Sequence, residues 1–159
     1  MATVLGANAT LYLADPFVMS TSPDANTVGG QVRVMHDSIE LSTAAVGDIA
    51  LFGRVLPTGS KIIDVIVHFD ALDATAATFD IGTSTYDGTD ATAVDQDQFL
   101  DGVSCIAAGG TSMSAQGTTI GTGPFSEIAD GEYISLEVAT VTSSLSGTVK
   151  ITVIYAEPT

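Results

Sequence analysis

Residues 56–72, LPTGSKIIDVIVHFDAL, form the stretch that decides the fold of this chain. They open with a turn signal, Pro57-Thr58-Gly59, and continue as a run with apolar side chains at alternate positions. Because successive side chains of a β-strand point to opposite faces, this run predicts one long strand with a wholly apolar inner face. That face comprises Ile63, Val65, Val67 and Phe69. The opposite face carries Ile62, Asp64, Ile66 and His68.

Strand signals recur on both sides of this run, with turn residues between them. Alternating patterns predict further strands over residues 31–41, 48–56, 78–82, 132–138 and 148–155. The strand over residues 31–41 divides into two pieces, with apolar residues at Val32, Val34, Ile39 and Leu41. The last two strands are expected to form a hairpin that ends the fold. Their inward residues are Ile134, Leu136 and Val138, then Val149, Ile151, Val153 and Tyr155.

Two segments leave their structure open. Residues 94–100 fit either one helical turn or a bulged loop, and the Gly- and Ser-rich residues 102–123 predict only one or two short strands. About seven to nine strands joined by long turns favour two packed antiparallel sheets. The predicted fold class is therefore all-β, an antiparallel β-sandwich that is jelly-roll-like, with an extended N-terminal arm.

The composition agrees with a single all-β domain. Of the 159 residues, 45% are hydrophobic and only 14% are charged, so a core can form without disulfides. Small polar residues at this density favour strands and turns over surface helices. Residues 1–30 hold few core residues, so we expect an N-terminal arm or edge segment there, with a frayed terminus as the alternative. Residues 31–159 are expected to form the β-sandwich domain.

The charge restricts the partners of the chain. Its net charge is −15, and its only Lys and Arg residues are Arg33, Arg54, Lys61 and Lys150. Binding to nucleic acid requires clustered Lys and Arg to replace counterions, and anionic membranes make the same demand. We therefore expect neither nucleic acid nor membrane as a partner. The acidic surface keeps copies soluble and mutually repelling until a specific contact overcomes the repulsion.

The chain offers little evidence of secretion or redox chemistry. Cys105 is the only cysteine, so we expect a small buried hydrophobic residue rather than a reactive thiol. No basic n-region with an apolar core is visible at the N-terminus, and no apolar run approaches the length of a membrane span. We expect the chain to be made and folded in a cytoplasm.

Few residues could carry chemistry. Asp95, Asp97 and Asp101 could place oxygen ligands around calcium, but they lack the Gly and Glu positions of a calcium loop. A solvated acidic loop is the default, and calcium is the alternative. His36 and His68 lie on predicted strands, and the sequence has no G-x-S-x-G nucleophile elbow. The sequence therefore predicts no catalytic, cofactor-binding or metal-binding residue and no enzyme activity.

A series of short motifs follows one order along the chain. These are Gly-Asp…Leu-Phe at 47–52, Leu-Pro-x-Gly-x-x-Ile at 56–62, Phe-Asp-Ala-Leu at 69–72, a short strand at 79–82, Tyr-Asp-Gly at 86–88, Asp-x-Asp-x-Phe-Leu at 95–100 and a closing strand at 147–155. In this order they resemble a group of small virion structural proteins of tailed bacteriophages. The resemblance covers residues 45–102 and 131–156, and each motif by itself is unspecific.

The resemblance implies a head decoration (cement) protein without enzyme activity. Such a protein stabilises the head by binding the outside of the major capsid lattice, so the implied location is the virion surface after synthesis in the host cytoplasm. The implied partners are the major capsid protein and further copies of the chain, for which we expect a homotrimer. Candidate contacts are the N-terminal arm and the apolar residues Ile62 and Ile66, with a second buried sheet face as the alternative for these two.

Two other classes of function remain open at this point. A receptor- or glycan-binding fibre or tail domain could use the same sandwich, with Tyr86 and Tyr133 on loops as platforms for sugars. A hydrolase would need a pocket around His68 with an acid–base pair.

Overall fold

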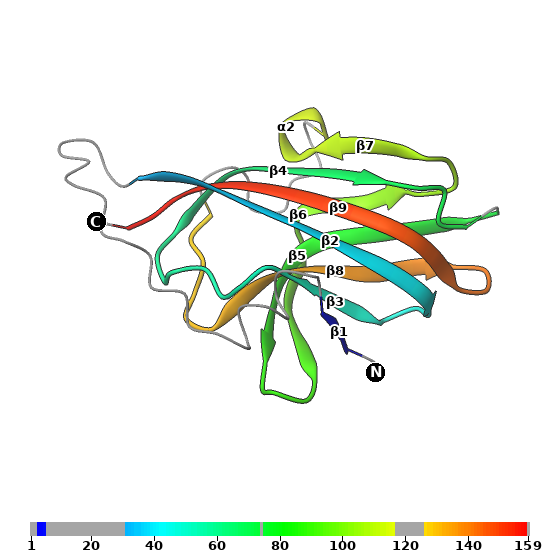
Figure 1. Cartoon of the computed structure of the whole chain (residues 1–159), viewed down its shortest axis with the longest axis horizontal. Coiled ribbons are helices and arrows are strands. Elements are labelled where there is room, and N and C mark those ends of the chain that lie inside the picture. The colour runs from blue at the N-terminus through cyan, green and yellow to red at the C-terminus, as the bar shows by residue number, and fades with distance from the viewer. Residues whose placement is uncertain (1–2, 6–30, 74, 117–125, 159) are drawn as a thin grey trace.

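Two β-sheets packed face to face make up the fold (Figure 1). The computed structural model describes residues 3–5, 31–73, 75–116 and 126–158. The five-stranded sheet has the order β1 (Thr3–Leu5), β3 (Ile49–Phe52), β8 (Glu132–Val141), β5 (Ala77–Tyr86), β6 (Ala91–Ser104). The four-stranded sheet has the order β2 (Val32–Ala44), β9 (Leu145–Ala156), β4 (Lys61–Phe69), β7 (Gly109–Ser112), and a short helix α2 (Met113–Gln116) follows β7.

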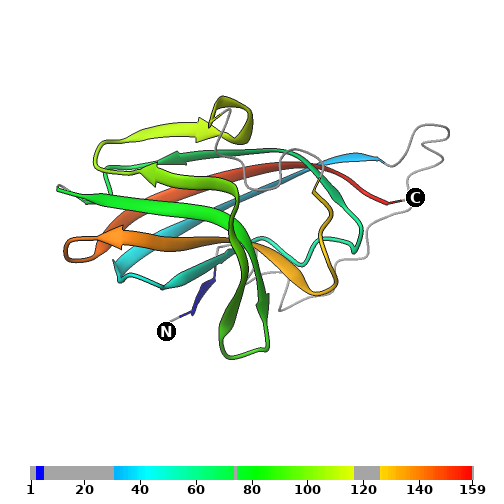
Figure 2. The ribbon, with the colours of Figure 1, turned by 180° about the vertical axis from the view of Figure 1, so that it is seen from behind.

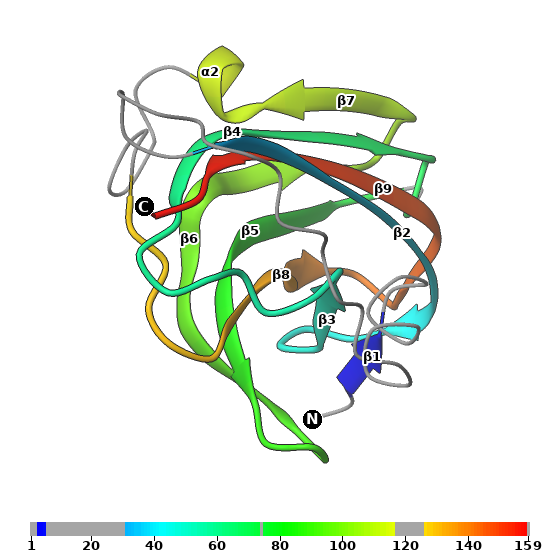
Figure 3. The ribbon, with the colours of Figure 1, turned by 60° about the vertical axis from the view of Figure 1, so that its left-hand side comes forward.

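This arrangement confirms the predicted all-β antiparallel sandwich. Apart from β1, which runs parallel to β3, all paired strands are antiparallel in the part of the chain that the structure describes. Seen from behind and from the side, the long strands of the two sheets enclose a common interior (Figures 2 and 3). Of the predicted arm over residues 1–30, only β1 lies within the described residues.

The chain crosses between the sheets repeatedly, as in a jelly roll. From β2 onward, β5 and β6 are the only consecutive described strands that pair with each other. The predicted hairpin of the last two strands is therefore wrong. β8 pairs with β3 and β5, whereas β9 pairs with β2 and β4 in the other sheet. Both strands still direct their apolar residues into the same core, which is why alternation alone did not distinguish the two arrangements.

The core lies between the sheets. The predicted inward residues of β8 and β9 are all buried there: Ile134, Leu136, Val138, Val149, Ile151, Val153 and Tyr155. Phe69 of β4 and Phe79 of β5 meet edge to face with ring centroids 5.2 Å apart, and so join the two sheets directly. Edge-to-face aromatic pairs add about 0.5–1.5 kcal/mol beyond their buried area. The main hydrophobic core thus lies between the sheets, and a second, smaller cluster comprises Ile49, Leu51, Ala91 and Tyr133.

A β-bulge near the start of β4 changes which of its first residues point into the core. Ile62 pairs with Tyr155 and Asp64 pairs with Ile154, so Ile63 has no partner in this ladder. The extra residue turns Ile62 inward, where it is fully buried, and leaves Ile63 only half-buried. The prediction for Val65, Val67 and Phe69 is confirmed, but Ile63 was assigned to the wrong face.

Residues 94–100 form a bulged strand, not a helical turn, within β6. Ile81 pairs with Leu100 and Thr83 with Asp95, so a longer piece of β6 lies opposite Gly82. A Cβ at Gly82 would overlap the carbonyl oxygen of Asp95. Glycine therefore permits the close approach of the two backbones that the bulge requires.

The strand predicted in two pieces over residues 31–41 is one continuous strand, β2. Its core side carries Met35, Ile39 and Leu41, whereas Val32 and Val34 lie outside with 63% and 60% of their surface exposed. The strand is an edge of its sheet in the described part of the chain.

Candidate functional site

The predicted acidic loop lies on the outside of the five-stranded sheet. Asp95, Asp97 and Asp101 belong to β6, Asp80 belongs to the adjacent β5, and Glu137 of β8 is the direct cross-strand partner of Asp80. We call these five residues the acidic face. The carboxylate of Asp80 accepts a 2.7 Å hydrogen bond from the backbone N–H of Gly102.

Burial and mutual repulsion act on the carboxyls of the acidic face. Desolvation raises the pKa of Asp80, and the charges of Asp101 and Asp97 raise it further, against the hydrogen bond from Gly102. Desolvation likewise raises the pKa of Asp95, with added repulsion from Asp97. The pKa of Glu137 is raised by desolvation and by Asp80. Like charges opposite each other destabilise a sheet, so a neighbouring cation would stabilise this face.

The acidic face does not have the geometry of a metal site. Across residues 3–5, 31–73, 75–116 and 126–158, no group of three or more His, Cys, Asp or Glu residues is arranged to hold an ion. Asp95, Asp97 and Asp101 are distributed along an extended strand instead of around a loop. Calcium, the alternative to a solvated acidic segment, therefore has no support in the described residues.

Beside the acidic face, a buried polar network joins three strands. The amide Nε2 of Gln96 donates 2.8 Å hydrogen bonds to the carbonyl of Thr83 and the hydroxyl of Ser84. Ser84 in turn donates to Ser135 at 2.8 Å. These contacts hold the bulged part of β6 against β5 and β8, and so position the carboxylates on either side of Gln96.

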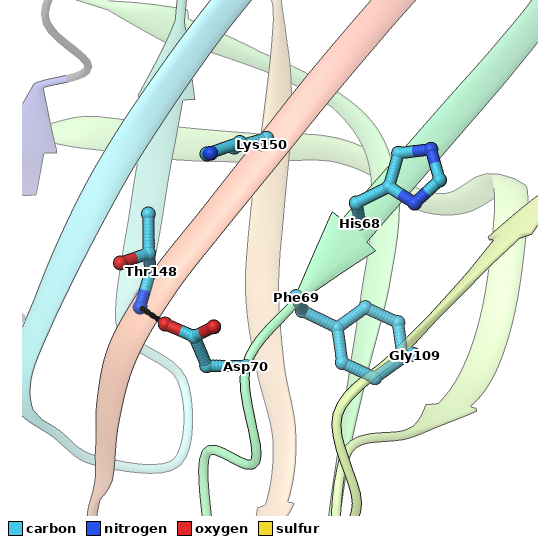
Figure 4. A pocket seen from close by; sticks show the side chains of 6 residues that line it. All are labelled: His68, Phe69, Asp70, Gly109, Thr148 and Lys150. Carbon is cyan, nitrogen blue, oxygen red and sulfur yellow. Dashed lines mark hydrogen bonds between the residues drawn. The ribbon is translucent and has the colours of Figure 1, made fainter.

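A second candidate lies on the outside of the four-stranded sheet, in a hollow of about 160 Å³ around His68 (Figure 4). It is lined by His68, Phe69, Asp70, Gly109, Thr148 and Lys150. The backbone N–H of Thr148 donates to Asp70 at 3.1 Å, and the Thr148 hydroxyl donates to Glu40 at 2.7 Å.

The hollow does not assemble a hydrolytic site. The carboxylate of Asp70 accepts the backbone N–H of Thr148. The hydroxyl of Thr148 donates to Glu40 and not to His68. Asp64, which shares the outer face of β4, accepts hydrogen bonds from the N–H and hydroxyl of Ser114. His36 lies apart on β2, with its Nδ1 2.9 Å from the hydroxyl of Thr152.

The remaining candidates are structural. Cys105 is fully buried, and desolvation followed by the charge of Asp73 raises the pKa of its thiol to about 11. Tyr86 and Tyr133, predicted on loops, lie on β5 and β8 and pack edge to face with centroids 6.4 Å apart. Desolvation, then the charge of Tyr86, raises the pKa of Tyr133, a residue that is only 6% exposed. They do not form an open platform for sugars.

Of the two apolar contact candidates, Ile62 is fully buried and cannot contact a partner, because the bulge turns it inward. Ile66 is half-buried on the outer face. The sequence interpretation missed the exposed valines Val32, Val34, Val46 and Val94. For Val32 and Val34 a signal was available, because they alternate with Met35 and Asp37, which are buried on the inward face of β2. No helix among the described residues has the length and apolarity of a membrane span.

No protein-family model and no curated protein matches this chain. Among solved structures, it is similar to a chain in the capsid of Ralstonia phage GP4, with 20% identity, a TM-score of 0.71 and 99% of each chain covered. A chain of the cyanophage Pam1 capsid asymmetric unit has 19% identity and a TM-score of 0.59, over 91% of this chain and 100% of that one. The acidic stable capsid structure of Helicobacter pylori bacteriophage KHP30 has 13% identity and a TM-score of 0.54, over 83% and 92%. At these identities the likeness is one of fold.

Proposed function

We propose that this chain is a structural component of a bacteriophage virion, and specifically a decoration or cement protein that binds the outside of the major capsid lattice. The observation that carries the proposal is the fold shared with a chain of the Ralstonia phage GP4 capsid over 99% of both chains. The ordered motifs of residues 45–102 and 131–156, which resemble small phage virion proteins, support the same conclusion independently of the fold.

The charge supports a position on the exterior of the shell. With a net charge of −15, the chain would be repelled by packaged DNA, whose backbone binds clustered Lys and Arg. On the outside, the same charge keeps unbound copies apart and soluble. A specific contact with the shell then has to overcome this repulsion, which favours attachment at defined sites.

The candidate sites support a non-enzymatic role. His68 makes no hydrogen bond to a serine or cysteine within the described residues, and the thiol of Cys105 is buried with a raised pKa. A nucleophile needs a base within hydrogen-bonding reach and access to substrate. Neither candidate satisfies both requirements.

The finer parts of the proposal concern assembly. We propose that residues 1–30 act as an arm beside the sandwich domain of residues 31–159, and that copies form a homotrimer. A trimer covers exposed sheet edges such as β2 by cyclic symmetry. Light scattering across a concentration series measures the native mass, and a stable mass other than that of a trimer would contradict this part.

The decisive experiment mixes the purified protein with phage heads that lack their decoration proteins and sediments the heads. We expect the protein to co-sediment at a saturating, fixed number of copies per head, and to raise the temperature at which the heads rupture. Absence of saturable binding to heads of the phage that encodes the chain would refute the decoration role. Empty tails serve as the control surface.

A receptor- or glycan-binding fibre domain is the alternative function. The edge-to-face packing of Tyr86 against Tyr133 argues against the sugar platform that this alternative assumed. Saturable binding to a glycan array, combined with no binding to heads, would favour the fibre domain over the decoration protein.

A further inference from the structure

The end of β9 and the start of β2 lie side by side, so the C-terminus is found next to the beginning of β2 (Figures 1 and 2). Val32 is the first residue of β2 and faces Ala156, the last residue of β9. One step further, the backbone N–H of Glu157 donates a 2.9 Å hydrogen bond to the carbonyl of Gln31. Because β2 is an edge strand in the described part of the chain, backbone pairing joins residues 31–34 only to the end of β9.

The side chains of residues 31–34 bury little surface. Val32 and Val34 are 63% and 60% exposed. Arg33 alternates with them and is partly buried, and its Nε donates a 3.2 Å hydrogen bond to Oε2 of Glu157. Among the described residues, Glu157 is the only acidic residue within ion-pair distance of Arg33. The contact of Arg33 with Glu157 is therefore the main side-chain interaction that fastens this end of β2.

The carboxylate of Glu157 connects a further part of the chain to this contact. Its other oxygen lies 4.0 Å from Nη2 of Arg54, which follows β3. The side chains of Arg33, Arg54 and Glu157 are only 21–28% exposed. Charge-assisted hydrogen bonds are strengthened where water is partly excluded, so this ion pair contributes more than an exposed one. The pair of Lys61 and Glu127, at the start of β4, is the exposed counterpart, with side chains that are 52% and 66% exposed.

From Met35 onward, β2 is anchored in the core independently of Glu157. Met35 is 8% exposed, and its sulfur packs so closely on Gly53 that a Cβ at Gly53 would overlap it. Asp37 is buried, and its carboxylate accepts the backbone N–H of Gly53 at 2.7 Å. Segments with few buried contacts open at a lower free energy than the core does. A local opening that begins at Gln31 therefore has its limit at Met35.

We propose that the contact between Arg33 and Glu157 is a latch. When the latch opens, residues 31–34 separate from β9 while Met35 stays in the core, and the chain that precedes Met35 is lengthened by four free residues. Four extended residues span about 13 Å. In the virion role proposed above, this length lets the N-terminal arm reach further across the shell. The inference rests on the proposed function for this use of the arm, and not for the latch itself.

Hydrogen exchange followed by mass spectrometry tests the latch in the full chain. Arg33→Ala and Glu157→Gln each remove the ion pair, and each should raise the exchange rate of residues 31–34 by about tenfold. Residues 36–41 of the same strand should stay within about twofold of the natural protein. Both substitutions remove one shared interaction, so the double variant should exchange no more than about twofold faster than the faster single variant. Glu127→Gln changes the net charge as Glu157→Gln does and breaks only the exposed ion pair, so it should leave residues 31–34 unchanged.

A disulfide tests the use of the arm. Val32 and Ala156 face each other in the ladder, so Val32→Cys combined with Ala156→Cys places two thiols where a disulfide can hold residues 31–34 against β9. The oxidised variant should bind phage heads at least about fivefold more weakly than its reduced form. Cys105 is fully buried and does not compete for the new thiols. Equal head binding by the oxidised and reduced forms would overturn the proposed use of the arm.

The exchange experiment separates the latch from the decoration role. Unchanged exchange of residues 31–34 in both single variants overturns the latch, as does exchange that rises equally along the whole of β2. An effect of Glu127→Gln on residues 31–34 as large as that of Glu157→Gln also overturns it, because net charge would then be the cause. The expected exchange pattern in a protein that does not bind heads would refute the decoration role alone. Saturable binding to heads by a protein whose variants exchange like the natural one would refute the latch alone.

Discussion

The bulge at the start of β4 predicts that alanine substitutions at the adjacent residues Ile62 and Ile63 destabilise the fold by different amounts. Ile62 is fully buried and Ile63 is half-buried, although simple alternation along the strand gives the opposite assignment. Substituting each by alanine removes the same atoms and the same intrinsic β-propensity at neighbouring positions. The difference in unfolding free energy between the two variants therefore reports the burial of the side chain.

The structure sets the magnitudes. Ile62→Ala deletes three carbons from a site with 0% exposure, which costs about 2.4 kcal/mol in transfer at about 0.8 kcal/mol per carbon, plus a term for the cavity left behind. We expect a total of about 3–4 kcal/mol. Ile63→Ala loses only part of the transfer contribution and leaves no enclosed cavity, so we expect about 1 kcal/mol or less.

Urea unfolding followed by circular dichroism provides the assay. With a slope of about 1–3 kcal/mol per molar urea, Ile62→Ala should lower the midpoint by about 1–4 M, and Ile63→Ala by well under half as much. Equal slopes for the two variants and the natural protein indicate that the comparison concerns stability alone. A larger loss in Ile63→Ala than in Ile62→Ala would refute the bulge and the register drawn from it.

Three further predictions follow from single sites. Gly82→Ala forces a Cβ into the backbone of β6 and should destabilise the fold by about 1–3 kcal/mol. A Cβ at Gly109 would have its nearest contact at 3.6 Å, so Gly109→Ala should cost less than about 1 kcal/mol. Equal urea midpoints for the two variants would contradict the close approach of the backbones at Gly82. The carboxyls of Asp80 and Glu137 have raised pKa values in the fold, so their favourable contribution is complete below the unfolded-state pKa and is lost as the pH rises through the folded-state pKa. The urea midpoint should therefore rise from pH 7 to pH 5, less steeply in Asp80→Asn, and a falling midpoint in that range would oppose this reasoning. Because burial raises the pKa of Cys105 to about 11, thiol reagents at pH 8 should label it only in denaturant, and fast labelling of the native protein would show an open site.

The inward residues of β8 and β9 were correctly predicted from alternation alone. Ile134, Leu136, Val149 and Ile151 are all buried, as their period of two required. This pattern is local, because it depends only on the alternate direction of successive side chains. The turn at Asp87 was similarly predictable: its carboxylate accepts the N–H groups of Thr89 and Asp90, both at 2.8 Å.

Pairing and register were not predictable in the same way. The expected hairpin of β8 and β9 is absent because the two strands belong to different sheets of one sandwich. Ile62 and Ile63 exchanged faces because a bulge added one residue against β9. Neither the pairing of β8 and β9 nor the bulge in β4 can be predicted from hydrophobic alternation, because alternation does not specify which strand lies next to which.

The two candidate sites, the acidic face and the hollow around His68, depended even more on the fold. The sequence shows an acidic chain with four Lys and Arg residues, and it shows the Asp-rich residues 94–101. It does not show that Asp80 and Glu137 lie opposite each other, or that Lys150 lies opposite His68. Those pairs come from strands up to 82 residues apart in the chain, the separation between His68 and Lys150.

By itself, the sequence therefore determined an all-β, strongly acidic domain and most of the residues that fill its core, because composition and alternation are local properties of the chain. Only the tertiary structure decided which strands pair and where the bulges fall. The physical reason is that a strand is compatible with several partners through the same backbone hydrogen bonds. The choice among them is made by long-range packing of the whole core.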